Sequence, residues 1–444
     1  MTLTVGEKEL LITSIGSHMG TYDAADGTYV CCKRGLSVRD YQDYVSSLKN
    51  QGYTVAAEYE LGGNSFSLLK GEDITVYVSH LRDAYELRIY AEPAGFADYP
   101  EVSAPVECDG EVTVFQLEVD SRGTRQNGGM TYVIKLANGN FLILDGGYYT
   151  DVEADRIYRV LRENTPEGKK PHIEGWFLTH MHGDHYGGMI RYAEKYATES
   201  ELDAYYHAGQ KCAGGLWNGM VEKFFVLRDF WEKKPRVYGK LHTGMIFEFA
   251  GVSVKVMCTH EDVYPKSFID GNDTSTVYRM DIAGQRVFFL GDCRDHECDA
   301  MMKAFERSGE LKCDIVQWSH HGYEGATREF YETVDAPTIL FPLNIVGWQE
   351  NYKEVPQNVF NGWFYIQNRP CGRYIHENLA NGKIKKVIVA GMGEQAITFP
   401  YYPEGEVMPD QWAFFEENKH DVPEGYELKG YRYVGDGRIE KIDG

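Results

Sequence analysis

The sequence predicts a mixed α/β protein with a small N-terminal α+β domain, residues 1–105, and a larger domain, residues 111–402. The chain has 444 residues, which is more than one ordinary domain contains. Hydrophobic residues make up 43% of it, enough for a large core and without a signature of disorder. Segments with apolar residues at helical spacing alternate with short strand-like segments. Residues 403–444 form a C-terminal extension.

The N-terminal domain contains one clear helix and one clear strand pair. Tyr41 and Val45 recur at helical spacing within residues 37–51, which predicts a helix there. Alternating residues at 75–80 and 85–90 predict paired strands joined by a polar turn. We find no cluster of catalytic residue types in this domain, so the sequence assigns it no chemistry.

The larger domain begins with strands and helices in alternation. The expected elements are a strand at 112–119, strands at 131–136 and 141–144, a helix capped by Asp151, a buried strand at 173–179 and a helix at 187–196. The tight turn at residues 137–140 makes the second and third strands a hairpin. Further strands are expected at 252–257, 286–290, 315–318, 337–342, 385–390 and 395–400.

The charge of the chain restricts its partners. A formal net charge of -22 repels long nucleic acids and anionic membrane surfaces, so we expect neither as a partner. The charge says nothing about small molecules, and the expected partner, a small-molecule substrate, follows from the motifs described below. The first twenty residues lack the basic and apolar regions of a signal peptide, and no segment is apolar enough to span a membrane. Nine cysteines, an odd number, do not indicate a disulfide framework. We therefore expect a cytoplasmic protein.

Four residues of metal-ligand type follow the expected strand at 173–179: His180, His182, Asp184 and His185. The first two histidines are two residues apart, so in an extended segment they project to the same side and can bind one ion. Asp184 and His185 can turn toward a second ion. An adventitious histidine-rich loop is the alternative, but four such residues after a buried strand favour a metal centre.

Two later strand ends carry further metal-competent side chains. The strand at 286–290 is followed by Gly291 and Asp292, and the strand at 315–318 is followed by Ser319 and the pair His320-His321. In α/β folds the chemistry is placed at the carboxyl ends of strands, on the loops that leave them. These residues are therefore candidates for the same centre.

Taken together, residues 111–402 resemble the metallo-β-lactamase superfamily, and the nearest pattern is the hydrolase domain of ComEC-type competence proteins. The motifs in chain order are Asp145-Gly146-Gly147, His180 to His185, Asn272 to Ser275, Gly291-Asp292 and His320 to Gly322. The resemblance implies a four-layer αββα sandwich, with two sheets face to face, helices outside and the metals at one edge. The strands at 337–342, 385–390 and 395–400 would complete the second sheet.

The superfamily commonly supplies a third imidazole to the first metal, and here three residues are candidates. His260 is the first choice because it follows the strand at 252–257. His242 precedes a glycine turn, and Asn272 would hold the metal more weakly.

The last ligand is His320 or His321. We favour His320 because it comes first after the strand, and we assign His321 to substrate contact or to protonation of the leaving group. Tyr323 follows the same turn and is a further catalytic candidate.

The resemblance implies a hydrolase with two metal ions. The two oxygens of Asp292 can bridge ions roughly 3.5–4 Å apart, with a hydroxide between them that Asp184 orients. Imidazole and carboxylate ligands suit Zn(II), and Mn or Fe can occupy similar sites. The resemblance makes the expected activity that of a phosphodiesterase acting on a small or moderate-sized substrate. The alternatives are an ester, lactone or thioester hydrolase of the same fold and, from another class, a metal-binding regulator without turnover.

Overall fold

The computed structural model describes residues 1–23, 27–106, 108–118, 129–208, 226–264, 271–322, 325–342, 374–375, 377–379, 381–390 and 393–403. It also gives the backbone of three short strands near the C-terminus, β24 (Glu427–Leu428), β25 (Tyr431–Tyr433) and β26 (Ile439–Lys441), which form a sheet of their own. Among the described residues, no helix is both long and apolar enough to cross a membrane.

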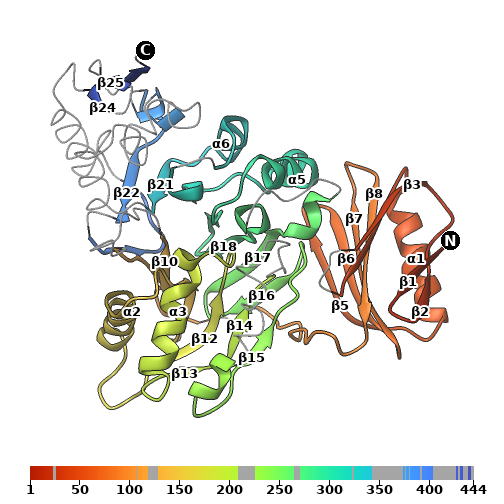
Figure 1. Ribbon diagram of the computed structural model, residues 1–444, viewed down its shortest axis with the longest axis horizontal. Coiled ribbons are helices and arrows are strands. Elements are labelled where there is room, and N and C mark those ends of the chain that lie inside the picture. Colours follow the sequence, from red (N-terminus) through yellow and green to blue (C-terminus); the bar gives the residue numbers. More distant parts are fainter. Residues whose placement is uncertain are drawn as a thin grey trace.

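The N-terminal part is an antiparallel sheet with one helix on it (Figure 1). A hairpin of β1 (Thr2–Val5) and β2 (Lys8–Leu11) precedes six strands in the order β3-β4-β8-β7-β6-β5. These are β3 (Ser17–Asp23), β4 (Tyr29–Arg34), β5 (Thr54–Leu61), β6 (Asn64–Lys70), β7 (Ile74–Leu81) and β8 (Glu86–Pro93). The predicted helix is α1 (Val38–Asn50), which Ser37 and Asp40 close with a capping box. The predicted strand pair is β7 and β8, so both predictions are confirmed.

The first sheet of the larger part has the order β15-β14-β12-β11-β10-β9-β23, with β13 paired to β12. Its strands are β9 (Thr113–Gln116), β10 (Thr131–Lys135), β11 (Phe141–Asp145), β12 (His172–Phe177), β13 (Glu201–Leu202), β14 (Ala204–Tyr206), β15 (Arg236–Tyr238) and β23 (Gln395–Thr398). Helices α2 (Asp151–Glu163) and α3 (Gly183–Tyr196) cover its outer face. Along β10, Tyr132 and Ile134 face the second sheet and Val133 faces the helices. This alternation buries both faces of the strand.

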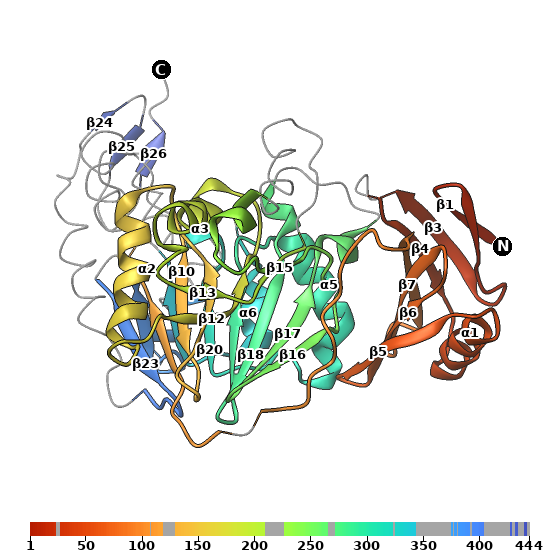
Figure 2. The same ribbon diagram turned by 90° about the horizontal axis from the view of Figure 1, so that it is seen from below.

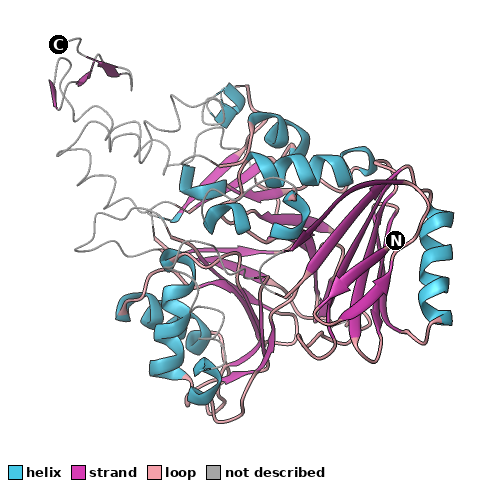
Figure 3. Ribbon diagram, turned by 45° about the vertical axis from the view of Figure 1, so that its right-hand side comes forward, coloured by secondary structure: helices cyan, strands magenta, loops and turns pink. Residues whose placement is uncertain are grey.

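The second sheet has the order β16-β17-β18-β19-β20-β21-β22. Its strands are β16 (Ile246–Phe249), β17 (Val252–Cys258), β18 (Val277–Ile282), β19 (Gln285–Phe289), β20 (Ile315–Gln317), β21 (Thr338–Phe341) and β22 (Lys386–Val389). Helices α5 (Asp295–Phe305) and α6 (Arg328–Val334) lie outside it. Figure 3 shows the two sheets between these two groups of helices. The predicted four-layer αββα sandwich is confirmed.

Three details differ from the sequence-based expectations. The strand expected at 395–400 to complete the second sheet is β23, and it pairs with β9 in the first sheet instead. The two sheets share one core, so the apolar residues of this strand could be buried in either sheet. The strand pairs with the first sheet because β9 offers it an edge with free backbone hydrogen-bonding groups. Helix α2 is capped by Thr150 rather than Asp151. Helix α3 begins at Gly183 rather than 187, which puts Asp184 in its first turn.

The N-terminal sheet packs directly on the larger part, beside β16, β17 and α5 (Figure 2). Phe66 belongs to the same buried apolar cluster as the sandwich core. The Tyr77 hydroxyl donates to the carbonyl oxygen of Thr243 at 2.9 Å, and Arg88 donates to that of Asp262 at 2.8 Å. Side chains of the N-terminal sheet thus donate hydrogen bonds to backbone oxygens of the larger part, so the polar groups at this interface are paired.

Candidate metal centre

Four of the predicted ligand residues come together with His321 where the loops after β12, β19 and β20 meet. Two groups of side chains have ligand atoms that all lie within 4.8 Å of one another. The first group is His180, His185 and Asp292, and the second is Asp184, His185 and His321. The groups share His185, so together they form one centre.

Asp292 belongs to the first group and also faces His321 of the second. Its Oδ2 is 3.6 Å from Nε2 of His180 and 3.8 Å from Nε2 of His320. Its Oδ1 is 3.3 Å from Nε2 of His185 and 3.4 Å from Nε2 of His321. Each oxygen of this carboxylate therefore faces a different set of imidazoles, as a bridging ligand requires.

The donor set fits a transition metal. Asp292, His180, His185 and His321 are all buried. Burying such groups costs free energy unless they are paired, hydrogen-bonded or bound to metal. Within the described residues, His180 Nε2 and Asp292 Oδ1 make no hydrogen bond. Imidazole and carboxylate ligands without thiolate suit Zn(II), Mn(II) or Fe(II).

The protonation of the imidazoles is set by burial and by the carboxylates. Burial, together with the nearby His185, lowers the pKa of His180 well below its ordinary value, so this ring is neutral at pH 7. Burial alone would lower the pKa of His185, but Asp292 and Asp184 hold it well above the ordinary value. The same two carboxylates raise the pKa of His321 to about 9 against the effect of burial. Coordination requires neutral imidazole, so a metal would displace protons here.

Asp145, at the end of β11, orients one of these rings. Its Oδ2 accepts a hydrogen bond from His185 Nδ1 at 2.7 Å, which leaves Nε2 facing the centre. Thr179 donates to both Asp145 oxygens, each at 2.8 Å, from its backbone nitrogen and its hydroxyl. Carboxylates behind a ligating histidine fix its tautomer and orientation. The sequence had indicated Asp145 only as part of a turn motif, and its position at a strand end was the available signal.

Backbone strain also concentrates at this centre. Asp145, His320 and His321 have φ angles of 55°, 49° and 51°, in the left-handed region that non-glycine residues rarely adopt. Such strain persists only where the surrounding structure holds it, and it is frequent at functional sites.

The structure places His321, rather than His320, in one of the two ligand groups. His321 donates from Nδ1 to the carbonyl oxygen of Pro342 at 2.8 Å, and its Nε2 lies 3.4 Å from Oδ2 of Asp184. His320 instead lies 3.0 Å from the side-chain nitrogen of Asn272, and 16% of its side chain is exposed. The sequence-based prediction of His320 as a metal ligand rests on its place directly after the strand. The left-handed backbone at both residues ends the strand alternation on which that assignment rested.

The three candidates for a further ligand lie in different places. Asn272, in the short helix η3 (Gly271–Thr274), is beside His320 at the centre. His242 is in the interface with the N-terminal sheet, where its Nδ1 is 2.6 Å from Glu261 and its ring stacks on Tyr77. His260, our first choice, is buried in the short helix η2 (His260–Val263) and belongs to neither ligand group.

Two predicted residues remain. His182 belongs to neither ligand group, but its ring centroid is 4.7 Å from that of His180. Its Nε2 would be 2.6 Å from a Cβ added to Gly271, so the ring lies against the segment that carries Asn272. Tyr323 lies outside the described residues.

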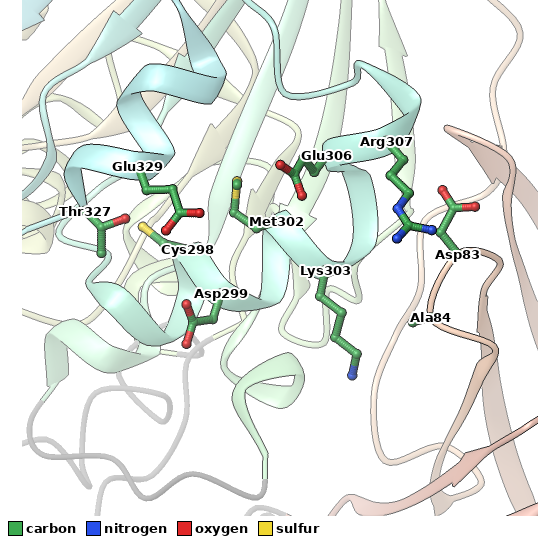
Figure 4. Close-up of a pocket in the computed structure, with 10 residues that line it drawn as sticks. All are labelled: Asp83, Ala84, Cys298, Asp299, Met302, Lys303, Glu306, Arg307, Thr327 and Glu329. Carbon is green, nitrogen blue, oxygen red and sulfur yellow. The ribbon is translucent and has the colours of Figure 1, made fainter.

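A cavity of about 400 Å³ lies elsewhere, between the turn joining β7 to β8 and the outer faces of α5 and α6 (Figure 4). Its lining mixes four carboxylates with two cations and includes Asp83, Asp299, Lys303, Glu306, Arg307 and Glu329. None of the residues around it is a candidate metal ligand. The described chemistry therefore lies at the loop edge of the sandwich and not in this cavity.

Comparison with known families identifies the segment that carries the centre. Residues 149–327 match the family model of the Beta-lactamase superfamily domain. The chain contains a beta-lactamase superfamily domain. The matched residues of this domain include every member of the two ligand groups, whereas Asp145 lies just before them. No curated protein matches the sequence.

Several solved structures are similar to the chain at low identity. The metallo-beta-lactamase fold protein YhfI from Bacillus subtilis is 11% identical, covers 65% of this chain and 99% of its own, and has a TM-score of 0.37. Human tRNase Z, short form, is 15% identical over 51% of this chain and 91% of its own, with a TM-score of 0.32. Zn(2+)-bound PqqB from Methylobacterium extorquens is 12% identical over 47% and 70%, with a TM-score of 0.30. At these TM-scores the similarities do not identify a function for the beta-lactamase superfamily domain.

Proposed function

We propose that the chain is a metal-dependent hydrolase with a dinuclear centre and that Zn(II) is its metal. The position of Asp292 carries this proposal, because its Oδ2 faces His180 while its Oδ1 faces His185 and His321. A carboxylate in this position can bridge two ions and hold them at the short separation that two-metal hydrolases use.

The proposed ligands divide between the two positions. His180 and Oδ2 of Asp292 would hold the first ion, and His182, packed against His180, would join them. Asp184, His321 and Oδ1 of Asp292 would hold the second ion. His185 belongs to both ligand groups.

Asn272 is our choice for the further ligand in place of His260. It lies next to His320, whose Nε2 is in turn 3.8 Å from Oδ2 of Asp292. An amide oxygen is a weaker ligand for Zn(II) than an imidazole, so we expect the first position to have the lower affinity.

The remaining groups support hydrolysis from the open side of the centre. When bound, divalent ions lower the pKa of water and polarise a substrate oxygen. Asp184 is 23% exposed, so one of its oxygens can accept a hydrogen bond from the attacking water and orient it. His320, which is also partly exposed, can contact the substrate beside Asp292.

The proposed substrate is a phosphodiester of small or moderate size. An aspartate at the bridging position, where several true β-lactamases have cysteine, supports this over a β-lactam. The net charge of -22 disfavours a long nucleic acid. An ester, lactone or thioester is the alternative substrate class, and a metal-binding regulator without turnover is the alternative of another kind.

The test is a metal-loaded activity screen on the full chain. Zn(II)-loaded protein and its Asp292→Asn variant would be assayed with bis(p-nitrophenyl) phosphate, a lactone, a thioester and a β-lactam, and metal content would be measured by elemental analysis. We expect about two ions per chain and phosphodiester turnover that the variant lacks. Turnover of only the lactone or thioester would favour the alternative substrates. Stoichiometric metal without any turnover would favour a regulator.

A further inference from the structure

One buried amide connects the loop after β19 with the loop after β20. Gln317 is the last residue of β20 and is completely buried. Its Oε1 accepts hydrogen bonds from the backbone nitrogens of Leu290 and Gly291, at 2.7 and 2.8 Å. Its Nε2 donates to the carbonyl oxygens of Gly291, at 3.1 Å, and Trp318, at 2.6 Å. All the hydrogen-bonding capacity of this amide is thus used on backbone atoms of two loops.

Gly291 is the point where three ligand-bearing loops meet. Its carbonyl oxygen accepts a second hydrogen bond, from the backbone nitrogen of His320 at 3.1 Å. Its φ is +57°, and an added Cβ would lie 2.8 Å from Cβ of Thr179, the residue before His180. The loop that presents Asp292 is therefore packed against the first histidine loop on one side and bonded to the second on the other.

Two further hydrogen bonds brace the same loop. The hydroxyl of Ser319 donates to the carbonyl oxygen of Cys293 at 2.6 Å. The backbone nitrogen of Asp292 donates to the hydroxyl of Ser275 at 3.2 Å. Each of these is a single bond, whereas three of the four bonds of Gln317 cross to the loop after β19, so Gln317 is the main connection between the two loops.

We propose that Gln317 is a positioning residue that fixes the separation of Asp292 and His321. Oδ1 of Asp292 and Nε2 of His321 are 3.4 Å apart, and they come from the two loops that Gln317 joins. Shifting one loop against the other would misplace the bridging carboxylate relative to the second ion. This inference rests on the proposed function for its link to metal, but the connection between the loops can be tested without metal.

The test compares two buried glutamines of the same sandwich. Gln317→Met removes four hydrogen bonds and keeps a similar side-chain volume. Gln116→Met is the matched control, because Gln116 on β9 is also buried, donates to Ile388 at 2.9 Å and accepts from Tyr132 at 3.0 Å. Zn(II) affinity is measured on the full chain by competition with a chromogenic chelator. We expect Gln317→Met to lose about 10- to 100-fold in affinity, the usual effect of changing a residue behind metal ligands. Gln116→Met should retain the wild-type affinity.

Hydrogen–deuterium exchange on the metal-free proteins gives the second readout. We expect faster exchange at residues 290–293 and 319–322 in Gln317→Met than in Gln116→Met, because only the first variant disconnects these loops. Equal exchange in the two variants would overturn the inference. Equal loss of Zn(II) affinity in both would also overturn it, since it would show a general effect of core damage. If the wild-type chain binds no Zn(II), the proposed function fails, and the exchange comparison alone decides the role of Gln317.

A second substitution covers the case in which Gln317→Met does not fold. Gln317→Glu keeps the acceptor for the nitrogens of Leu290 and Gly291 but places an oxygen against the carbonyl oxygens of Gly291 and Trp318. We expect it to speed exchange at residues 319–322 more than Gln116→Met does. No difference between these two variants would overturn the inference.

Discussion

Replacing Asp145 by Asn should weaken metal binding through the tautomer of His185. Oδ2 of Asp145 accepts from His185 Nδ1 at 2.7 Å, so the wild-type ring carries its proton on Nδ1 and offers Nε2 to the centre. In the variant, an amide nitrogen facing His185 would donate to Nδ1, and the proton would move to Nε2. A protonated nitrogen cannot ligate a metal. Asn tolerates the left-handed backbone at this position, where φ is 55°, so the change adds little strain.

The expected effect of Asp145→Asn is a loss of about 10- to 100-fold in Zn(II) affinity, which corresponds to about 1.4–2.7 kcal/mol. The assay is Zn(II) competition with a chromogenic chelator at neutral pH. Asp335→Asn is the control, because Asp335 also has a positive φ, 56°, and its carboxylate pairs only with Lys312 and Lys383 among the described ion pairs. If Asp145→Asn binds Zn(II) as tightly as Asp335→Asn does, the proposed role of Asp145 is wrong.

Three further predictions address the centre and the interface. His321→Ala should lose one of two ions by elemental analysis, whereas His320→Ala should keep both and lower the rate; loss of an ion only from His320→Ala would restore the original assignment. Asp292→Asn should abolish hydrolysis and reduce metal content with little change in the melting temperature of the metal-free protein, and near-normal turnover would exclude a bridging role. At the interface, burial opposes ionisation of Glu86, but Arg88 and a neighbouring lysine lower its pKa from 4.5 to about 2. The difference corresponds to about 3 kcal/mol of stability, present above pH 4.5 and lost as the pH falls toward 2. Glu86→Gln should remove most of this pH dependence when the free energy of unfolding is measured at a series of acidic pH values. The same dependence in the variant and the wild type would contradict the role given to Glu86.

The sequence alone determined the parts of the protein that depend on local spacing. Helix α1 follows from apolar residues at helical intervals, and β10 and β11 follow from two short apolar runs around a tight turn. The cluster from His180 to His185 was evident because four possible ligand residues occupy six positions after a buried strand. These features need no knowledge of distant residues, since each depends on neighbours in the chain.

Only the tertiary structure decided which distant residues share the centre. The presence of His321 rather than His320 in a ligand group accompanies a left-handed backbone that no spacing rule reveals. Asn272 lies at the centre, whereas His242 lies in the interface with the N-terminal sheet. Their positions in the sequence would have allowed either residue to be the further ligand. The role of Gln317 is visible only once its four backbone partners are seen around it. The local sequence pattern shows which residues can act as ligands. Long-range packing and strained backbone determine where the ligand atoms lie, and a metal centre depends on those positions to within a fraction of an ångström.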